Sequence, residues 1–415
     1  MAYTRVHSIT TVSPPNDHVT IETTPPEPWW QRYQPVSYQI KSRSGTQEQF
    51  KDMVSRCNKV GVRIIVDAVL NHMVGEGTPD GVGYSGCSFK AQAYNEYFAC
   101  VPFHSENFND RKCTSGSGGI ENWNDPNQVR QCRLSGLLDL DNSQDYVRQK
   151  QRDYLNTLVG MGVAGFRLDA AKHIYPGDLQ SILDQVQDLP VSQGFAPGTR
   201  PFVIQEVQAD ATIKAEDYFG TGRVTNFQYG RYVTGAVWKK GQNFKYFSNF
   251  GSQWNMMADN GAANFIDNHD QQRSNPFQVL TYKNGEGQYS MGVAFMLAWN
   301  YGVPRVMSSF YFDSKDQGPP LNGDVARSIR SPTFGPDQRC NKDSGWVCEH
   351  RYPVIRNMVK YRSVTSGEPI QNILTQDHRI AFRHGSKGFF ALNNAPDSWS
   401  QRLDKPLLMT KLLLF

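Results

Sequence analysis

Four short segments of the chain each combine a carboxylate or an imidazole with an apolar run. They are DAVLNH (67–72), GFRLDAAKH (165–173), QEV (205–207) and FIDNHD (265–270). An aspartate that follows a strand is more often a helix cap than a catalyst, so each segment alone is weak evidence. Four such segments at regular intervals predict acidic side chains at the carboxyl ends of successive parallel strands.

Apolar runs alternate with amphipathic stretches on both sides of these segments. Residues 47–60 have the spacing of an amphipathic helix, and Val62–Val69 follows as a strand buried on both faces. The same pattern predicts helices over 143–159 and 288–299 and strands over 163–168, 202–204, 264–266 and 304–312. This alternation predicts an α/β fold, a (β/α)8 barrel, whose active site lies at the carboxyl ends of its strands.

The alternation stops in two regions. Residues 74–140 are rich in Gly, Ser, Asn and Cys and are too long for a plain loop between strand and helix, so they predict an inserted subdomain. After about residue 367 the chain has short strand-like runs separated by turns. The predicted domains are therefore a barrel over 1–73 and 141–367, an inserted domain over 74–140, and a partial C-terminal β domain over 368–415.

The seven cysteines indicate an oxidising compartment. Six of them bracket short loops in pairs, which favours disulfides over metal ligation because no CxxC pair is present. Cys57 is left over. The predicted pairs are Cys87 with Cys100, Cys113 with Cys132, and Cys340 with Cys348.

Composition excludes several classes of protein. The formal net charge of +4 is small and Lys and Arg form no runs, which argues against a nucleic-acid partner. No apolar run is long enough to span a membrane, and the first residues lack the apolar core of a signal peptide.

Taken together, the four segments resemble, in order, the four signature regions of alpha-amylases, most of all those of the animal-type, chloride-activated branch. The resemblance extends to VSPPN (12–16), PWWQRYQPVSY (28–38), CRLSGLLDL (132–140), PRVMSS (304–309) and WVCEH (346–350). It covers nearly the whole chain. It implies a secreted, monomeric enzyme that hydrolyses internal α-1,4-glucosidic bonds of starch, glycogen and malto-oligosaccharides.

A retaining glycosidase needs a carboxylate nucleophile and a protonated carboxylic acid roughly 5 Å apart across the scissile bond. By resemblance, Asp169 is the nucleophile, Glu206 is the general acid and base, and Asp270 is the third carboxylate, which grips sugar hydroxyls. Arg167 stands two residues before Asp169 and points to the same side of the strand. We expect its charge to favour an ionised Asp169.

The resemblance also implies residues that bind the glucan. Trp29, Trp30 and Tyr33 resemble an aromatic platform for glucose rings, and His72 and His269 resemble donors to sugar hydroxyls. Asp67 is expected to support the site without doing chemistry. Weaker candidates for sugar contacts are Leu137, Arg167, Lys172 and His173.

Two ions are implied in the same way. Calcium would bind side-chain oxygens of Asn71 and Asp139 and backbone carbonyls of Arg130 and His173, and would tie the inserted domain to the barrel. Chloride would bind Arg167, Asn268 and Arg305 and help to keep Glu206 protonated.

The chain departs from the family pattern at both ends. MAYTRVHSITT and KPLLMTKLLLF resemble nothing in the family, and a Gly/His-rich loop is absent after FIDNHD, as in invertebrate members. These departures predict a barrel without its first strand and helix, and they leave Cys57 without its usual partner. The alternative interpretation is an impaired or inactive amylase-like protein that binds glucans. A membrane-anchored transporter subunit and an exo-acting α-glucosidase agree less well with the sequence.

Overall fold

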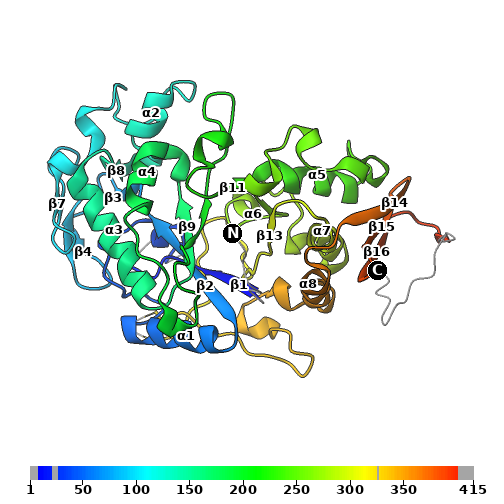
Figure 1. Cartoon of the computed structure of the whole chain (residues 1–415). Coiled ribbons are helices and arrows are strands. Elements are labelled where there is room, and N and C mark those ends of the chain that lie inside the picture. Colours follow the sequence, from blue (N-terminus) through cyan, green and yellow to red (C-terminus); the bar gives the residue numbers. More distant parts are fainter. Residues whose placement is uncertain (1–7, 21–26, 325–326, 401–415) are drawn as a thin grey trace. The chain divides into compact units, whose positions relative to one another are not determined.

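The computed structural model describes residues 8–20, 27–324 and 327–400. They form two compact units (Figure 1). Unit 1 comprises the described residues up to Val224 together with Asp316–Ile329, and unit 2 comprises Thr225–Lys315 together with the described residues from Arg330 onward.

Unit 1 is built on a parallel sheet. Its strands lie in the order β1 (Ser8–Val12), β2 (Val62–Val69), β9 (Gly165–Asp169), β10 (Phe202–Gln205) and β11 (Arg223–Asn226), and every neighbouring pair is parallel. The register places Asp67 beside Arg167 and Val69 beside Asp169. The carboxyl ends of β2 and β9 therefore carry the predicted polar residues side by side. Strand β1 comes from the part of the chain that resembles nothing in the family.

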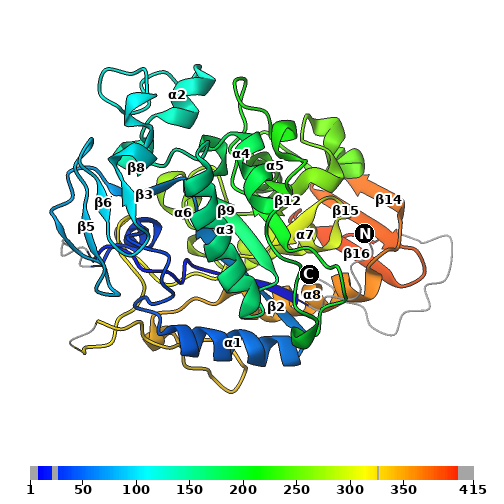
Figure 2. The same cartoon turned by 60° about the vertical axis from the view of Figure 1, so that its left-hand side comes forward.

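Helices α1 (Gln47–Lys59), α3 (Asp145–Gly160) and α4 (Pro176–Leu183) lie along this sheet (Figure 2). Helix α1 begins with a capping box between Thr46 and Gln49, and Gly61 follows its end with a φ of +78° that favours glycine. The predicted helices and strands of this unit are confirmed, with ends that differ by one or two residues.

The inserted region contains two small antiparallel sheets. Strand β3 (His72–Gly75) pairs with β8 (Leu137–Asp139), and β4 (Gly81–Val82), β5 (Ser88–Lys90), β6 (Tyr97–Phe98) and β7 (Phe103–His104) form a second sheet. Helix α2 (Pro126–Gln131) precedes β8. A small aromatic core fills the region, and it includes Phe89, Phe98 and Phe103.

All three predicted disulfides are present. Two of them lie in the inserted region and stabilise a segment with few regular elements, and the third lies in unit 2. Cys57 is half-buried and carries a free thiol. The bridges are Cys87–Cys100, Cys113–Cys132 and Cys340–Cys348.

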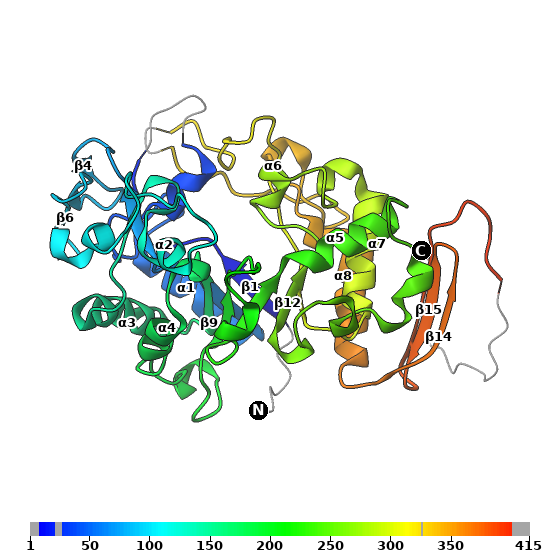
Figure 3. The same cartoon turned by 90° about the horizontal axis from the view of Figure 1, so that it is seen from above.

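Unit 2 combines helices with one pair of parallel strands and one antiparallel sheet (Figure 3). Strand β12 (Ala262–Phe265) is parallel to β13 (Val303–Arg305), and β14 (Ile370–Gln376), β15 (Arg379–His384) and β16 (Gly388–Asn393) form the predicted antiparallel C-terminal sheet. The helices are α5 (Phe227–Val237), α6 (Gln271–Ser274), α7 (Glu286–Ala298) and α8 (Pro353–Thr365).

Helix α7 lies at the centre of the core of unit 2. Nine of its residues are buried, so it has apolar side chains all round instead of one apolar stripe. It packs with aromatic residues of α5, of the C-terminal sheet and of the segment between α5 and β12, such as Tyr229, Phe247 and Phe382.

The predicted strand over 304–312 is wrong beyond Arg305. The chain leaves the sheet there because the backbone N–H of Ser309 donates to the Glu349 carboxylate at 2.6 Å instead of to a neighbouring strand. Across residues 8–20, 27–324 and 327–400, no helix has the length and apolar character that a membrane crossing requires.

Candidate active site

Arg167 is the centre of the polar cluster at the strand ends of unit 1. Its guanidinium is 3% exposed, and its Nη1 donates to Asp67 Oδ1 and to Asp169 Oδ1, both at 2.6 Å. Its Nη2 lies 3.0 Å from Glu206 Oε2. One buried cation therefore holds the predicted nucleophile and the predicted acid within a few ångströms of each other.

Backbone geometry places Glu206 against the end of β9. The N–H of Glu206 donates to the carbonyl of Leu168 at 2.9 Å, and the N–H of Ala170 donates to Glu206 Oε2 at 2.9 Å. Ala170 adopts the left-handed conformation, with a φ of 48°, which is uncommon for a residue with a side chain. The turn after Asp169 is thus bent so that a backbone donor faces the second carboxylate.

The protonation of Asp169 reflects two opposing effects. Burial raises the pKa of Asp169 well above its usual value, the Arg167 cation lowers it, and the nearby carboxylates Glu206 and Asp67 raise it again. The expectation that Arg167 favours an ionised Asp169 therefore describes only one part of the balance. Buried carboxylates this close together cannot all be ionised without a large electrostatic cost.

Two histidines of the site are neutral at neutral pH, because burial lowers the pKa of His72 and of His173 to about 4. His72 Nε2 lies 2.9 Å from the carbonyl oxygen of Tyr33, which can only accept, so the ring's single N–H is used there. His72 can thus donate to a sugar hydroxyl only by exchanging this bond, and its predicted role stays a prediction.

The aromatic platform residues lie in a short 3-10 helix, η1 (Trp29–Tyr33). The rings of Trp29 and Tyr33 meet edge to face at 5.9 Å, and Trp30 Nε1 donates to Asp316 Oδ1 at 3.3 Å. Tyr33 Oη donates to Asp67 Oδ2 at 2.9 Å. Asp67 therefore joins η1 to Arg167, which agrees with the supporting role expected of it.

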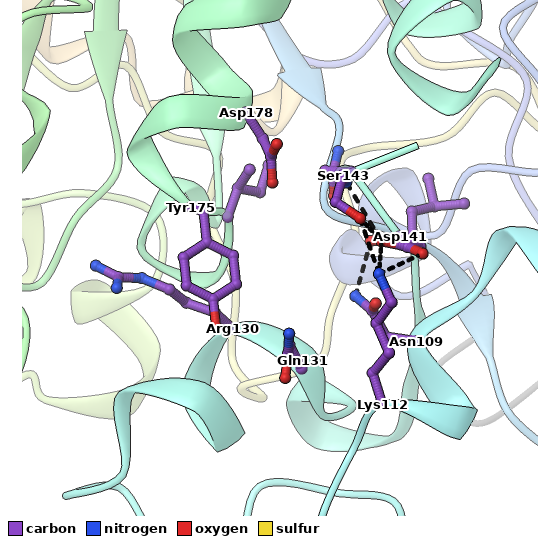
Figure 4. A pocket seen from close by; sticks show the side chains of 11 residues that line it. Asn109, Lys112, Arg130, Gln131, Asp141, Ser143, Tyr175 and Asp178 are labelled. Atoms are coloured by element: carbon purple, nitrogen blue, oxygen red, sulfur yellow. Dashed lines mark hydrogen bonds and ion pairs between the residues drawn. The ribbon is translucent and has the colours of Figure 1, made fainter. Parts of the chain in front are cut away.

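Asn71 and Asp139 lie side by side, since Asn71 Nδ2 donates to Asp139 Oδ1 at 3.1 Å. His173 lies next to Arg130 in space, because His173 Nδ1 donates to the carbonyl of Val129, the residue before Arg130, at 2.7 Å. A small pocket is lined by Arg130 and by Leu140, which follows Asp139 (Figure 4). In the described ranges no three His, Cys, Asp or Glu side chains gather as metal ligands.

The FIDNHD segment of unit 2 follows β12. Asp270 immediately precedes α6, and Asn268 Oδ1 accepts from the backbone N–H of Gln271 at 2.7 Å. His269 Nε2 lies 3.4 Å from Asp270 Oδ2. The register of β12 and β13 places Arg305 beside Phe265. Unit 2 thus brings Asn268, His269 and Asp270 together in one loop.

Comparisons with known proteins agree with this arrangement. Residues 31–306 match the family model described as alpha amylase, catalytic domain. Pancreatic alpha-amylase of Rattus norvegicus is 47% identical over 406 residues, which cover 94% of this chain and 77% of that protein. Alpha-amylase 1B of Homo sapiens is 46% identical over the same shares. The crystal structure of alpha-amylase I from Eisenia fetida has a TM-score of 0.86 at 40% identity and covers 93% of this chain and 78% of that one.

The chain belongs to the alpha-amylase family. The fold class predicted from the alternation of strands and helices, and the endo-hydrolysis of α-1,4-glucosidic bonds predicted from the motifs, are both confirmed at the level of that family. A point mutant of the earthworm alpha-amylase I was solved with maltohexaose.

Sequence reasoning missed two residues that contact Lys172. Trp123 is 47% exposed, and its ring lies 6.0 Å from that of His173 and 5.7 Å from Lys172 Nζ. Asp210 binds the same lysine at 2.6 Å. The signal that could have found Trp123 was a tryptophan in a stretch rich in Gly, Ser and Asn. Leu137 is half-buried at the start of β8, and its predicted sugar contact stays a prediction.

A buried polar network stands behind the FIDNHD segment. Tyr289 Oη and Gln272 Nε2 donate to the Asp267 carboxylate at 2.8 and 2.7 Å, and Gln272 Nε2 also donates to Ser309 Oγ at 2.7 Å. Ser309 in turn donates to Glu349 through its hydroxyl and its backbone N–H. The network connects α7, the β12 end and the segment next to the Cys340–Cys348 bridge.

The two carboxylates of this network hold protons unusually tightly. Burial raises the pKa of Asp267 to about 8, with a further rise from Glu349, and burial raises the pKa of Glu349 to about 7. The folded state therefore binds the Glu349 proton more tightly than the unfolded chain does, so stability falls as the pH rises from about 4.5 to about 7.

We predict that Glu349→Gln, which resembles the protonated form, removes this slope. Between pH 4.5 and 7 the free energy of unfolding of the variant should rise relative to that of the wild type by on the order of 2 kcal/mol. Urea titrations at a series of pH values measure it. Glu286→Gln is the control, because Glu286 pairs with Arg339 at the surface of unit 2. A constant difference across the pH range would refute the prediction.

Proposed function

We propose that this chain hydrolyses internal α-1,4-glucosidic bonds of starch, glycogen and malto-oligosaccharides by a retaining, double-displacement mechanism. The observation that carries the proposal is the contact of one buried guanidinium, that of Arg167, with both Asp169 and Glu206 at neighbouring strand ends. Retaining enzymes need two carboxyl groups at such short range.

In the first step, an Asp169 oxygen attacks the anomeric carbon while Glu206 gives its proton to the glycosidic oxygen that leaves. The result is a covalent glycosyl ester on Asp169 and a released fragment, which carries the original reducing end and a new hydroxyl formed from the glycosidic oxygen. In the second step, Glu206, now ionised, takes a proton from water as the water oxygen attacks the same carbon and releases Asp169. Asp270 and His269 of unit 2 would grip hydroxyls of the reacting sugar.

Several residues would position the glucan and not react with it. Trp29, Trp30 and Tyr33 of η1 offer aromatic faces, and apolar sugar faces stack on such rings. Trp123, whose ring lies 5.7 Å from Lys172 Nζ, offers a further aromatic face. His72 and His173 are buried and neutral, and they hold backbone carbonyls of Tyr33 and Val129 in place.

The residues predicted to bind calcium fit a hard cation. Asn71 Oδ1 is buried and has no hydrogen-bond partner, and burial raises the pKa of Asp139 well above its usual value although Asn109 and Asn71 donate to it. Calcium would supply the missing positive charge to these oxygens. Together with the carbonyls of Arg130 and His173, it would fasten the inserted region to the strand ends that carry Glu206.

The chloride proposal comes from the resemblance, which names Arg167, Asn268 and Arg305. Guanidinium and amide N–H groups are suitable donors to an anion, and Asn268 presents its amide nitrogen because its oxygen is engaged by Gln271. A bound chloride would offset the charge of the arginines and help to keep Glu206 protonated. The three disulfides and the resemblance to animal-type amylases support an extracellular location for the protein.

We predict that Asp169→Asn lowers the release of reducing ends from soluble starch by at least about 10³-fold, because the amide cannot act as the nucleophile. The melting temperature should stay close to that of the wild type. Asp145→Asn, at an exposed position on α3, is the control and should keep full activity. Wild-type protein without activity, or Asp169→Asn with normal activity, would each contradict the proposed function.

Chloride dependence is a separate prediction. The wild-type rate should rise when chloride is added to a chloride-free assay, and Arg305→Gln should lose this response because one of two cationic ligands is gone. Gluconate at the same ionic strength controls for screening. Equal wild-type rates with and without chloride would exclude the chloride site and would leave the catalytic proposal intact.

The calcium proposal is tested by measuring the melting temperature with and without calcium. Calcium should raise the melting temperature of protein previously stripped with EDTA, and Asp139→Asn should lose most of that rise. Asp141→Asn is the matched control, because Asp141 pairs with Lys112 at 2.7 Å and should leave the calcium response in place. An unchanged response in Asp139→Asn would show that the ion binds elsewhere.

A further inference from the structure

Two buried arginines lie beside the platform helix η1 and take no part in the proposed chemistry. Arg32 is 6% exposed, and the side chain of Arg43 is 1% exposed. Within the described ranges, these two guanidinium groups form a single salt bridge, from Arg43 Nε to Glu27 Oε2 at 3.5 Å. Burying a cation without a counter-charge is costly, so this pair calls for an explanation.

Arg32 and Arg43 also lack hydrogen-bond partners for several of their nitrogens. All three nitrogens of Arg43, and Nε of Arg32, are buried and have no hydrogen-bond partner. Buried donors in native proteins nearly always have a partner, and an ion is one of the ordinary explanations when a protein partner is missing. Four guanidinium nitrogens thus lack an acceptor in one small region.

The hydrogen bonds of Arg32 bring its guanidinium to the residue that follows Arg43. Arg32 Nη1 donates to the Oγ of Ser44, the residue after Arg43, at 3.1 Å, and Arg32 Nη2 donates to the carbonyl of Pro14 at 2.7 Å. Burial lowers the pKa of Arg32 to about 10, and the charge of Arg43 contributes to this lowering. Burial also lowers the pKa of Arg43, against the effect of Glu27.

The surrounding groups do not neutralise the pair. Glu27 Oε2 also accepts from Gln31 Nε2 at 2.6 Å, and Glu27 Oε1 lies 3.5 Å from Arg327 Nη1, so one carboxylate is shared among several donors. His18 is fully buried nearby, and burial together with Arg32 and Arg43 lowers its pKa to about 3. The region therefore keeps an excess of positive charge.

We propose that Arg32 and Arg43 line a binding site for a small inorganic anion, separate from the chloride site at Arg167, Asn268 and Arg305. The anion would accept from the guanidinium nitrogens that lack partners and would offset the repulsion between the two cations. Chloride and phosphate share this chemistry. Because Arg32 belongs to η1 and Arg43 to the turn before α1, the bound anion would fasten the segment that carries Trp29 and Trp30.

The experiment follows the melting temperature of the full chain in chloride-free gluconate buffer while chloride or phosphate is added at constant ionic strength. A tenfold excess of anion over its dissociation constant should raise the melting temperature of the wild type by roughly 2 °C. A response to chloride alone or to phosphate alone identifies the ion. No rise with either anion overturns the proposal, since a carboxylate of the chain would then be the counter-charge.

Arg43→Met separates an anion site from an ordinary structural arginine. Without added anion the variant should melt at or above the wild-type temperature, because an apolar side chain replaces an uncompensated buried charge. Added phosphate should have no effect on it, and the rise with chloride should shrink to what the proposed chloride site contributes. A structural arginine predicts the opposite, a variant that melts well below the wild type in anion-free buffer. Arg327→Met, at a half-buried arginine on the same Glu27, should keep the anion response.

Two further measurements keep this site distinct from the chloride activation. Arg305→Gln should lose activation by chloride and keep the anion-dependent rise in melting temperature. Crystals soaked in bromide should show an anomalous peak between Arg32 and Arg43 in the wild type and none there in Arg43→Met. Loss of the rise in Arg305→Gln, or no peak in the wild type, would overturn the proposal.

Discussion

The arrangement of unit 1 depends on one buried cation. Arg167 is enclosed at the end of β9 and binds Asp67, Asp169 and Glu206. Three carboxylates so close together would repel one another strongly without a positive charge among them. The guanidinium therefore permits the cluster to exist, and its planar fork sets the directions from which the carboxylates approach. Asp67 carries the constraint outward, because it also accepts from Tyr33 of the platform helix.

Unit 2 meets the same electrostatic problem in a different way. Asp267 and Glu349 are fully buried, and they are satisfied by Tyr289, Gln272 and Ser309, all of them neutral donors. Burial raises the pKa of both carboxyl groups toward neutrality. In unit 2, protonation reduces the negative charge of the buried carboxyl groups, whereas in unit 1 the Arg167 cation offsets it. The loop with Asn268, His269 and Asp270 is held by this network, so its geometry depends on groups with no direct part in the reaction.

The two proposed ion sites of unit 1 lie where buried polar or charged groups lack partners. Asn71 and Asp139 present oxygens that suit a cation, whereas Arg32 and Arg43 present nitrogens that suit an anion. Asn71 lies just after β2 and Asp139 ends β8 of the inserted region, whereas Arg32 and Arg43 lie before α1. Ions are an economical way to fasten such segments, because a single ion satisfies several polar groups at once.

Much of this molecule could be predicted from local features of the sequence. The apolar run Val62–Val69 became β2 without change, because a strand buried on both faces has an unmistakable pattern. The three disulfides followed from pairs of cysteines a few residues apart. The family, and with it the candidate nucleophile and acid, followed from four short motifs, since a catalytic chemistry restricts residue types at each position. Local patterns failed at residues 306–312, where Glu349, forty residues away from Ser309, takes the backbone N–H that a strand would have used.

The sequence by itself thus determined the family, and it named the candidate residues for the chemistry and the strands that carry them. Only the tertiary structure decided the protonation and the partners of those residues. Burial raises the pKa of Asp169 against the effect of Arg167, the single N–H of His72 is bound to Tyr33, and Arg43 is buried without an acceptor. These properties arise from the low polarity and close packing of groups that are distant in sequence, and the type and spacing of neighbouring residues do not contain them.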